Sequence, residues 1–284
     1  SLSEMRAANN LAHLLQYDDH AGAMEACRQG LEIANRLGDV RFISSFAWAE
    51  AAYLDRDGRF DEARQLRDDV RERVDLPPGD ISWFELTDHM IAAARGDEGA
   101  VEFAGEAIER SRDGENPQAQ VSIPIKRAAL HFISGEFESA FQQAMSVGRD
   151  DRLPGHVESA LFAAAMLEDG PKLQSVLDQL RVCRGRGRMV TSLTGAASGA
   201  IAAVHGATDE AIAGFRSALG FNYLSLDRAM LQALFAVLVG RDTAEGRRAS
   251  DEAFSVFSGS GALAFIDVFA AGMPPVEERM AAGE

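Results

Sequence analysis

The chain has 284 residues, of which 46% are hydrophobic, and its formal net charge is −16 at pH 7. That hydrophobic content is ordinary for a folded protein and argues against disorder, and the length fits one or two compact domains or one extended repeat array. The negative charge argues against a nucleic-acid-binding face over the whole molecule, because phosphate binding depends on Lys and Arg.

No apolar run approaches the ~20 residues that a membrane-spanning helix needs. The start of the chain has no basic stretch followed by an apolar one, so no signal peptide is visible. Cys27 and Cys183 lie far apart in helical surroundings, which favours two buried thiols in a reducing compartment. We therefore expect a cytoplasmic protein without a membrane partner.

The first residue is Ser1, and an amphipathic helix follows almost at once. We interpret the chain as a segment of a longer protein, and removal of an initiator Met is the alternative. The apolar spacing predicts seven helical pairs and a short final helix. The pairs, in chain order, cover 4–16 with 20–37, 41–56 with 60–74, 80–95 with 100–108, 117 onward with 138–147, 154–167 with 171 onward, 189–204 with 208–219, and 225–239 with 243–257, and the final helix covers 262–270.

Local sequence signals indicate where some of these helices begin or bend. Ser82 and Glu85 have the spacing of a capping box at the start of the third pair, with Asp80 as the alternative cap. Pro117 is expected at the first position of its helix, and Pro124 should kink that helix or mark its true start. Residues 274–284 are polar and are expected to form a tail after a single repeat domain over 1–273.

One turn pattern recurs along the chain, and Gly58–Ala63 is its best copy. Glycine ends one helix in the left-handed conformation, acidic residues occupy the first turn of the next helix, and a small alanine allows close helix packing. The pattern places alanines at 23, 63, 100, 140 and 211, at intervals of 40, 37, 40 and 71 residues. Two helices in a period of this length indicate a helical solenoid. We therefore predict an all-α, right-handed α-α superhelix of about seven hairpins with a C-terminal cap helix.

The hairpins resemble tetratricopeptide repeats, through the turn Gly58–Ala63. The segments Leu31–Asp39, Ala211–Leu219, Leu226–Ala229 and Gly246–Phe254 are similar to the repeat region of bacterial adenylate/guanylate cyclase-like ATPase regulators and of related transcriptional activators. The resemblance implies a sensing or protein-interaction arm that follows ATPase or cyclase domains in the same chain. The catalytic residues of those domains would lie outside this segment.

Motifs for chemistry are weak. The six histidines are scattered, and neither His-Glu-x-x-His nor Cys-x-x-Cys occurs, so no metal site is expected. Gly259–Ala264 matches a dinucleotide pattern in form but follows a helix, and no P-loop occurs, so no cofactor is expected. The pairs Asp18-Asp19, Asp68-Asp69 and Asp150-Asp151 are interpreted as solvated charge. The basic segment 181–188 is either a solvated connector or a contact for a phosphate or an acidic domain.

The leading functional expectation is a non-catalytic arm that binds a peptide, a partner domain or a small effector in its concave groove. A free-standing repeat adaptor is the alternative, and an enzyme is disfavoured because no catalytic residue is recognised. First helices of such repeats line the groove, and the two tryptophans there could anchor a partner or pack in the core. The expected groove residues are Arg6, Asn9, His13, Trp48, Trp83, Arg127 and His131.

Overall fold

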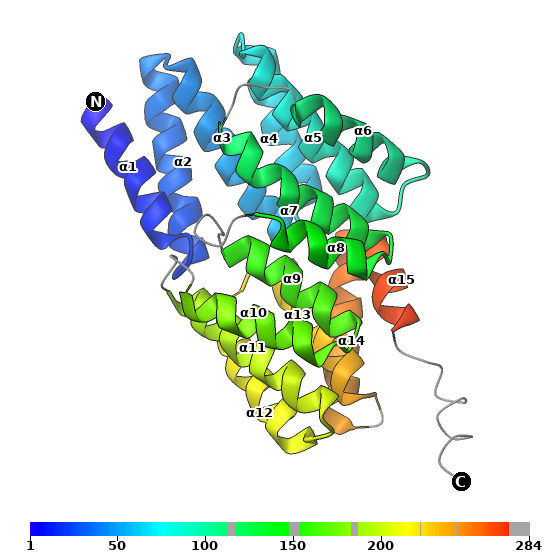
Figure 1. Cartoon of the computed structure of the whole chain (residues 1–284). Coiled ribbons are helices and arrows are strands. Elements are labelled where there is room, and N and C mark those ends of the chain that lie inside the picture. The colour runs from blue at the N-terminus through cyan, green and yellow to red at the C-terminus, as the bar shows by residue number, and fades with distance from the viewer. Residues whose placement is uncertain (113–116, 148–153, 183–186, 222, 242, 273–284) are drawn as a thin grey trace.

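The computed structural model of the chain describes residues 1–112, 117–147, 154–182, 187–221, 223–241 and 243–272. These residues form fifteen α-helices and no strand (Figure 1). The helices are α1 (Leu2–Leu15), α2 (His20–Leu37), α3 (Val40–Arg56), α4 (Phe60–Arg73), α5 (Pro78–Arg95), α6 (Ala100–Arg112), α7 (Pro117–Ile133), α8 (Phe137–Met145), α9 (Pro154–Met166), α10 (Gly170–Val182), α11 (Arg188–Val204), α12 (Thr208–Leu219), α13 (Ser225–Val239), α14 (Ala244–Ser260) and α15 (Leu263–Ala271).

Helices adjacent in the chain pack as antiparallel pairs, and α15 follows the seventh pair. The all-α class and the sequential pairing predicted from the sequence are therefore confirmed. Gly58, Gly96, Gly135 and Gly206, the glycines of the recurrent turn, have φ of 78°, 79°, 74° and 76°. A side chain would strain the backbone in this left-handed region, which explains why the turn selects glycine.

Some predicted helix starts are wrong. Helix α5 begins at Pro78, where proline fits the first helical turn because it needs no backbone donor. The Ser82 hydroxyl donates to the Pro78 carbonyl at 3.0 Å, so it lies inside the helix and the predicted capping box is absent. Helix α7 starts at Pro117 and contains Pro124. The expected tail 274–284 and the pair Asp150-Asp151 lie outside the described residues.

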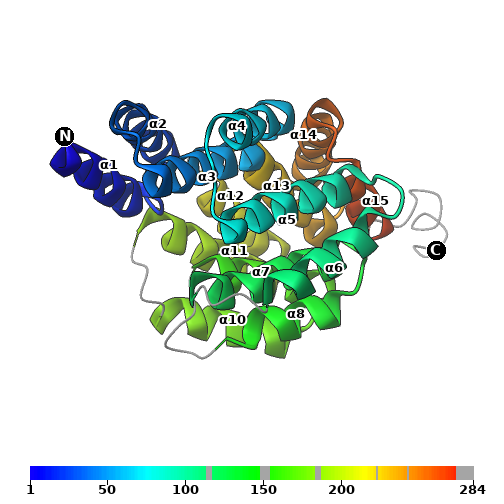
Figure 2. The ribbon, with the colours of Figure 1, turned by 90° about the horizontal axis from the view of Figure 1, so that it is seen from above.

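The inner layer of the molecule is a ring of first helices. Helix α3 contacts α5, and contacts continue in turn through α7, α9, α11 and α13, which itself contacts α3. Figure 2 shows α14 and α15, from the end of the chain, beside α4 and α5, from its first third. Helix α15 contacts α5, α7 and α13. The repeat array thus closes on itself, and its first helices face one another across a shared interior.

Hydrogen bonds between distant turns and helix ends hold the ring closed. The Asp18 carboxylate, in the α1–α2 turn, accepts from the backbone N–H of Arg188 at 2.7 Å, where α11 begins. The Asp57 carboxylate, in the α3–α4 turn, accepts from the backbone N–H of Ser225 at 3.0 Å, where α13 begins. Each aspartate thereby satisfies a helix N-terminus that lacks a side-chain cap from its own flanking residue.

Candidate functional site

The predicted groove residues do not meet in one place. Arg6 and His13 are exposed and Asn9 is half-buried, all on α1, which packs on α2 outside the inner ring. No hydrogen bond or ion pair among the described residues joins any of the seven predicted groove residues to another.

The two tryptophans are half-buried against apolar cores. Trp48 packs against the core of the first hairpins, and Trp83 packs against a smaller core formed by α5, α6 and α7. On α7, Arg127 pairs with Glu109 of α6, and the Nδ1 atom of His131 lies 2.6 Å from the Oε2 atom of Glu136. Each of these four residues therefore has neighbours of its own within the described part of the chain.

The structure instead gathers ionisable side chains in the interior, at the end of α3. A guanidinium nitrogen of Arg56, the last residue of α3, lies 2.7 Å from a carboxylate oxygen of Asp227 in the first turn of α13. Glu158 extends the group from α9, and its carboxylate interacts electrostatically with both residues. Helix α13 contacts both α3 and α9, which brings these three charges together. We call Arg56, Glu158 and Asp227, with Asp55 and Lys126 beside them, the inner cluster.

The side chains of the inner cluster are only partly exposed to solvent. Arg56 keeps 33% of its side-chain surface accessible and Asp227 keeps 14%. Lys126 and Glu158 are likewise half-buried. Desolvation is nevertheless the largest influence on the pKa of each of these four groups. Their charges are therefore surrounded by protein groups more than by water, and this burial shifts each pKa.

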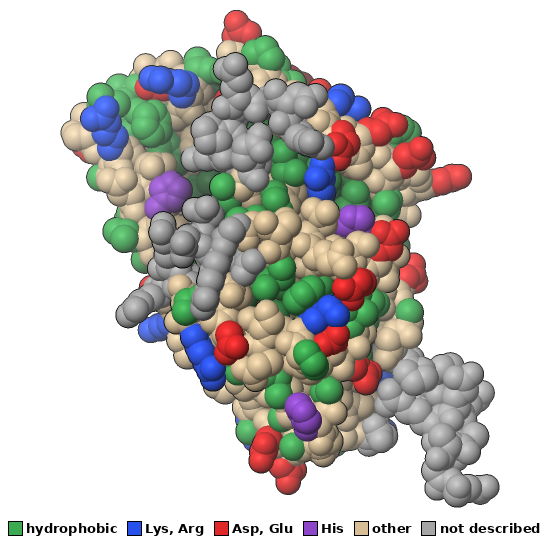
Figure 3. All heavy atoms as spheres, in the orientation of Figure 1, with side chains coloured by type: hydrophobic (Ala, Val, Ile, Leu, Met, Phe, Trp, Pro, Cys, Tyr) green, Lys and Arg blue, Asp and Glu red, His purple; other side chains and the backbone are tan. Residues whose placement is uncertain are grey.

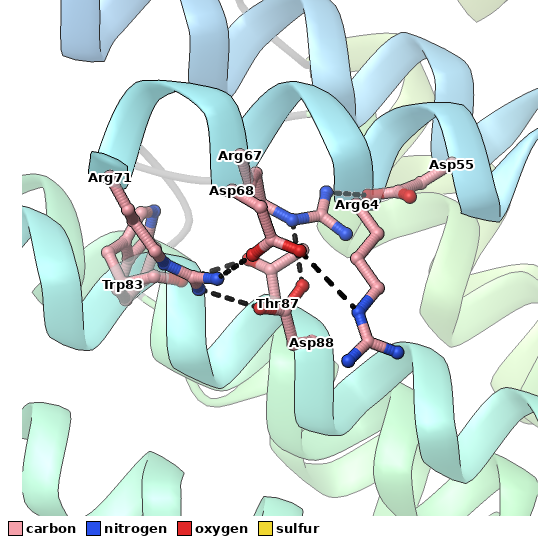
Figure 4. A network of polar contacts seen from close by, with 8 residues as sticks. All are labelled: Asp55, Arg64, Arg67, Asp68, Arg71, Trp83, Thr87 and Asp88. Atoms are coloured by element: carbon pink, nitrogen blue, oxygen red, sulfur yellow. Dashed lines mark hydrogen bonds and ion pairs between the residues drawn. The ribbon is translucent and has the colours of Figure 1, made fainter. Parts of the chain in front are cut away.

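A network of ion pairs joins α3, α4 and α5 next to the inner cluster (Figure 4). Arg67 of α4 is fully buried, and its guanidinium donates to Asp88 of α5 at 2.8 Å and to Asp55 of α3 at 2.9 Å. Arg71, one turn later, donates to the other oxygen of Asp88 at 2.6 Å and to Asp68 at 2.7 Å. The network holds α4 to the two inner helices beneath it and orients Asp55.

Asp55 connects this network to the inner cluster. Its Oδ2 atom is bound by Arg67, while its Oδ1 atom is buried without a hydrogen bond to any described residue. Burial raises the pKa of Asp55 to about 6, against the attraction of Arg67 and Lys126. Burial also lowers the pKa of Lys126, and the negative charge of Asp55 opposes that change. Asp55 and Lys126 therefore influence each other electrostatically.

Aromatic and polar side chains surround the inner cluster. His20 is 2% exposed, packs on the rings of Tyr53 and Phe221, and makes no hydrogen bond of ordinary geometry with a described residue. Its pKa falls to about 4, chiefly through burial and then through the charge of Arg56. The Tyr223 hydroxyl lies 2.5 Å from that of Ser192, and its pKa is raised by burial and by Glu158.

The charged groups of the inner cluster shift one another's pKa values. Burial raises the pKa of Glu158 and that of Asp227, and Asp227 raises the pKa of Glu158 further. Burial opposes the charge of Arg56, but the two carboxylates outweigh it and raise the Arg56 pKa. A group of neighbouring titratable side chains with such perturbed pKa values is typical of functional sites. The charged groups of the inner cluster can bind a polar ligand through ion pairs and hydrogen bonds.

Other sequence features have structural roles. Asp19 accepts from the backbone N–H of Gly22 at 3.0 Å and so caps α2. Gly261, in the segment of dinucleotide-like form, ends α14 in the left-handed conformation. Cys27 is a buried free thiol whose pKa burial raises to about 11, whereas Cys183 lies outside the described residues. Within segment 181–188, residues 183–186 also lie outside them.

Within the described residues, no group of three or more His, Cys, Asp or Glu side chains is placed to hold a metal ion. No described helix is both long and apolar enough to cross a membrane. On the face in Figure 3, the Lys and Arg side chains are scattered and form no continuous patch. The fold defines an all-helical protein of sequentially paired helices, consistent with a helical repeat. Comparison with protein-family models finds no match, and comparison with curated proteins finds none either.

The sequence contained only a faint signal for the inner cluster. Lys126 is one of two lysines among 28 basic residues, and Asp55-Arg56 lies one residue before the best copy of the turn. Neither feature reveals that α9 and α13 return to the end of α3. The inner cluster depends on closure of the ring, which local periodicity does not encode.

Proposed function

We propose that this chain is a non-catalytic sensing arm of a larger bacterial regulator, and that it binds a small polar effector beside the inner cluster. The observation that carries the proposal is the convergence of accessible yet desolvated charges from α3, α7, α9 and α13. A small molecule suits this position better than a peptide, because the inner helices contact one another around a ring.

The same position suits transmission of a signal. Arg56 contacts Asp227, and the next residue, Asp57, bonds to Ser225 at the start of the same helix. An effector that alters the charge around Arg56 would change how strongly α3 holds α13. Differential binding to two states of this contact would shift the population of the ring and bias an attached domain.

Thermal unfolding of the full chain with a panel of small cations, anions and zwitterions tests the proposal. A ligand at 100 times its Kd stabilises the folded state by about 2.7 kcal/mol. That corresponds to a rise in Tm of roughly 5–10 °C for a chain of this size. We expect one charge class to raise the Tm of the wild type, and Glu158→Gln to reduce the rise. Glu32→Gln, a change at an exposed position on α2, should leave it intact.

Three readouts separate the functional alternatives. A sensor gives a saturable shift without turnover of the ligand. An adaptor gives co-purifying protein and no shift with any small molecule in the panel. Consumption of the ligand would contradict the non-catalytic assignment.

A further inference from the structure

One of the contacts that close the ring joins the α1–α2 turn to the start of α11. The Tyr17 carbonyl accepts a hydrogen bond from the backbone N–H of Met189 at 3.0 Å. The Asp18 carboxylate accepts one from the backbone N–H of Arg188 at 2.7 Å. We call this contact the seam. Elsewhere α1 packs on α2, and α2 packs on α3. Opening of the seam would therefore release one closure of the ring and leave these helix contacts in place.

His20, the first residue of α2, lies next to the seam. Its ring packs on that of Tyr53 of α3, at 6.1 Å between centroids, and edge-to-face on that of Phe221, after α12, at 5.6 Å. Phe221 packs in turn edge-to-face on Tyr223, whose hydroxyl contacts that of Ser192 on α11. One imidazole ring thus connects the α1–α2 hairpin, through a chain of side-chain contacts, to the later helices that it meets at the seam.

The surroundings of His20 suit a neutral ring and not an imidazolium. The side chain is 2% exposed, and neither ring nitrogen makes a hydrogen bond of ordinary geometry with a described residue. An imidazolium donates from both nitrogens and is costly to bury without acceptors. The protonated ring would gain both donors and a charge in a site of aromatic neighbours.

The charged groups that face the ring do not compensate for this cost. Arg56 of α3 repels a second positive charge, whereas Asp19 of the same turn and the Gln16 carbonyl at the end of α1 attract it. Burial and Arg56 outweigh these two attractions and lower the pKa of His20 to about 4. Tyr53 stays neutral, because burial raises its pKa to about 12. A protonated His20 is therefore more stable in water than in its site.

We propose that the seam is a pH-sensitive switch: in mild acid a proton from solvent binds to His20, the imidazolium moves into water, and the α1–α2 turn separates from the start of α11 while the helices stay folded. The proton is held by a ring nitrogen, and only the hydrogen bonds of the seam are broken. A state with an exposed His20 binds the proton more tightly than the closed state does, so a fall in pH shifts the population toward it. The inference goes beyond the proposed function, because the switch needs no small ligand.

Hydrogen exchange of the full chain, followed residue by residue by NMR, tests the switch. The backbone amides of Arg188 and Met189 report on the seam, and that of Leu234, inside α13, reports on global unfolding. After correction for the intrinsic exchange rate, protection of the two seam amides should fall about 30-fold between pH 7.5 and pH 5, since the pKa of His20 is about 4 when closed and 6.5 when exposed. Leu234 should stay better protected than both at each pH.

Two variants without a titrating ring test the assignment to His20. His20→Phe and His20→Leu should each lose the fall in seam protection between pH 7.5 and pH 5. The matched control is His13→Gln, at an exposed histidine on α1, which should keep the full response. A measurement on the wild type makes the test independent of whether the variants fold: ring resonances of His20 should be those of a neutral imidazole at pH 5.5.

Each contrary outcome overturns a defined part of the inference. Equal protection of the seam amides and of Leu234 at pH 5 would mean that the seam opens only when the whole chain unfolds. An unchanged pH response in His20→Phe, or a charged His20 ring in the folded chain at pH 5.5, would exclude His20 as the group that controls the seam. Failure of every small ligand to raise the Tm would overturn the proposed function and leave the switch standing.

Discussion

The carboxylate of Asp57 accepts hydrogen bonds from both the backbone N–H and the hydroxyl of Ser225, at 3.0 and 2.6 Å, across 168 positions of sequence. The carboxylate of Asp18 accepts a hydrogen bond from the backbone N–H of Arg188 across 170 positions. Two successive hairpin turns near the start of the chain thus cap two successive inner helices near its end. This correspondence keeps the inner ring in register.

Replacement of Asp57 by alanine should weaken the closure. Loss of a helix N-cap costs about 1 kcal/mol, and Asp57→Ala should lower the free energy of unfolding by that amount in urea titrations. Asp57→Asn retains an acceptor oxygen and should lose less. Equal stability of Asp57→Ala and the wild type would show that the bond to Ser225 contributes nothing to closure.

Arg67 should be the most sensitive charged residue in the N-terminal half. Arg67→Met leaves Asp55 and Asp88 without their buried partner, and we expect a loss of about 3 kcal/mol in unfolding free energy. Arg64→Met is the matched control on the same helix, because the Arg64 side chain is 69% exposed and lies 3.8 Å from Asp68. It should change stability by less than about 0.5 kcal/mol. Similar losses in the two variants would argue against a structural role for the buried pairs.

His20 should make the protein sensitive to mild acid. Its pKa is about 4 in the folded chain against an ordinary 6.5, so between these values the unfolded chain binds a proton that the folded chain does not. Stability from this residue is complete above pH 6.5 and is lost as the pH falls toward 4, by about 2 kcal/mol at pH 5.

The variant His20→Phe keeps a ring against Tyr53 and Phe221 and removes the titration. Urea titrations at pH 7.5 and pH 5 should show the variant gaining about 2 kcal/mol on the wild type at the lower pH. The variant must be compared with the wild type at each pH, because Asp55 and Glu158 also make stability depend on pH. Their pKa values are raised in the folded chain, so they favour folding as the pH falls, whereas His20 opposes it. A difference that does not change with pH would mean that His20 titrates normally.

Helices α11 and α12 cross so closely that only glycine fits at the contact. A Cβ atom at Gly214 would lie 2.7 Å from the Cα atom of Gly199. Gly214→Ala should cost about 1–3 kcal/mol through overpacking. Gly105→Ala, inside α6, meets its nearest atom at 3.8 Å and should instead stabilise by roughly 0.5–1 kcal/mol. Thermal unfolding of the two variants should therefore move in opposite directions.

Local features of the fold could be predicted from the sequence because their causes are local. Glycine turns and apolar stripes fix where a helix begins, and α12 and α13 have the predicted bounds of 208–219 and 225–239. The start of α5 was missed, because Pro78 begins the helix before the serine that looked like a cap. Ring closure could not be predicted, because it joins turns and helix ends that no sequence period relates.

The same reason limited prediction of the site. The choice of first helices as the inner layer agrees with the structure for α3, α5 and α7, which carry four of the predicted residues. The ionisable groups that meet in the interior come from four helices spread between residues 55 and 227. Only the return of α13 to α3 makes them neighbours, and that return was not foreseen.

Closure also restricts how this architecture can vary. An open repeat array tolerates gain or loss of a unit, because each unit contacts only its neighbours. Here the turn that contains Asp18 meets the start of α11, and the turn that contains Asp57 meets the start of α13. An inserted or deleted hairpin between these partners would misalign both contacts at once. The number of hairpins in this protein is therefore set by geometry, much as the number of strands is set in a closed barrel.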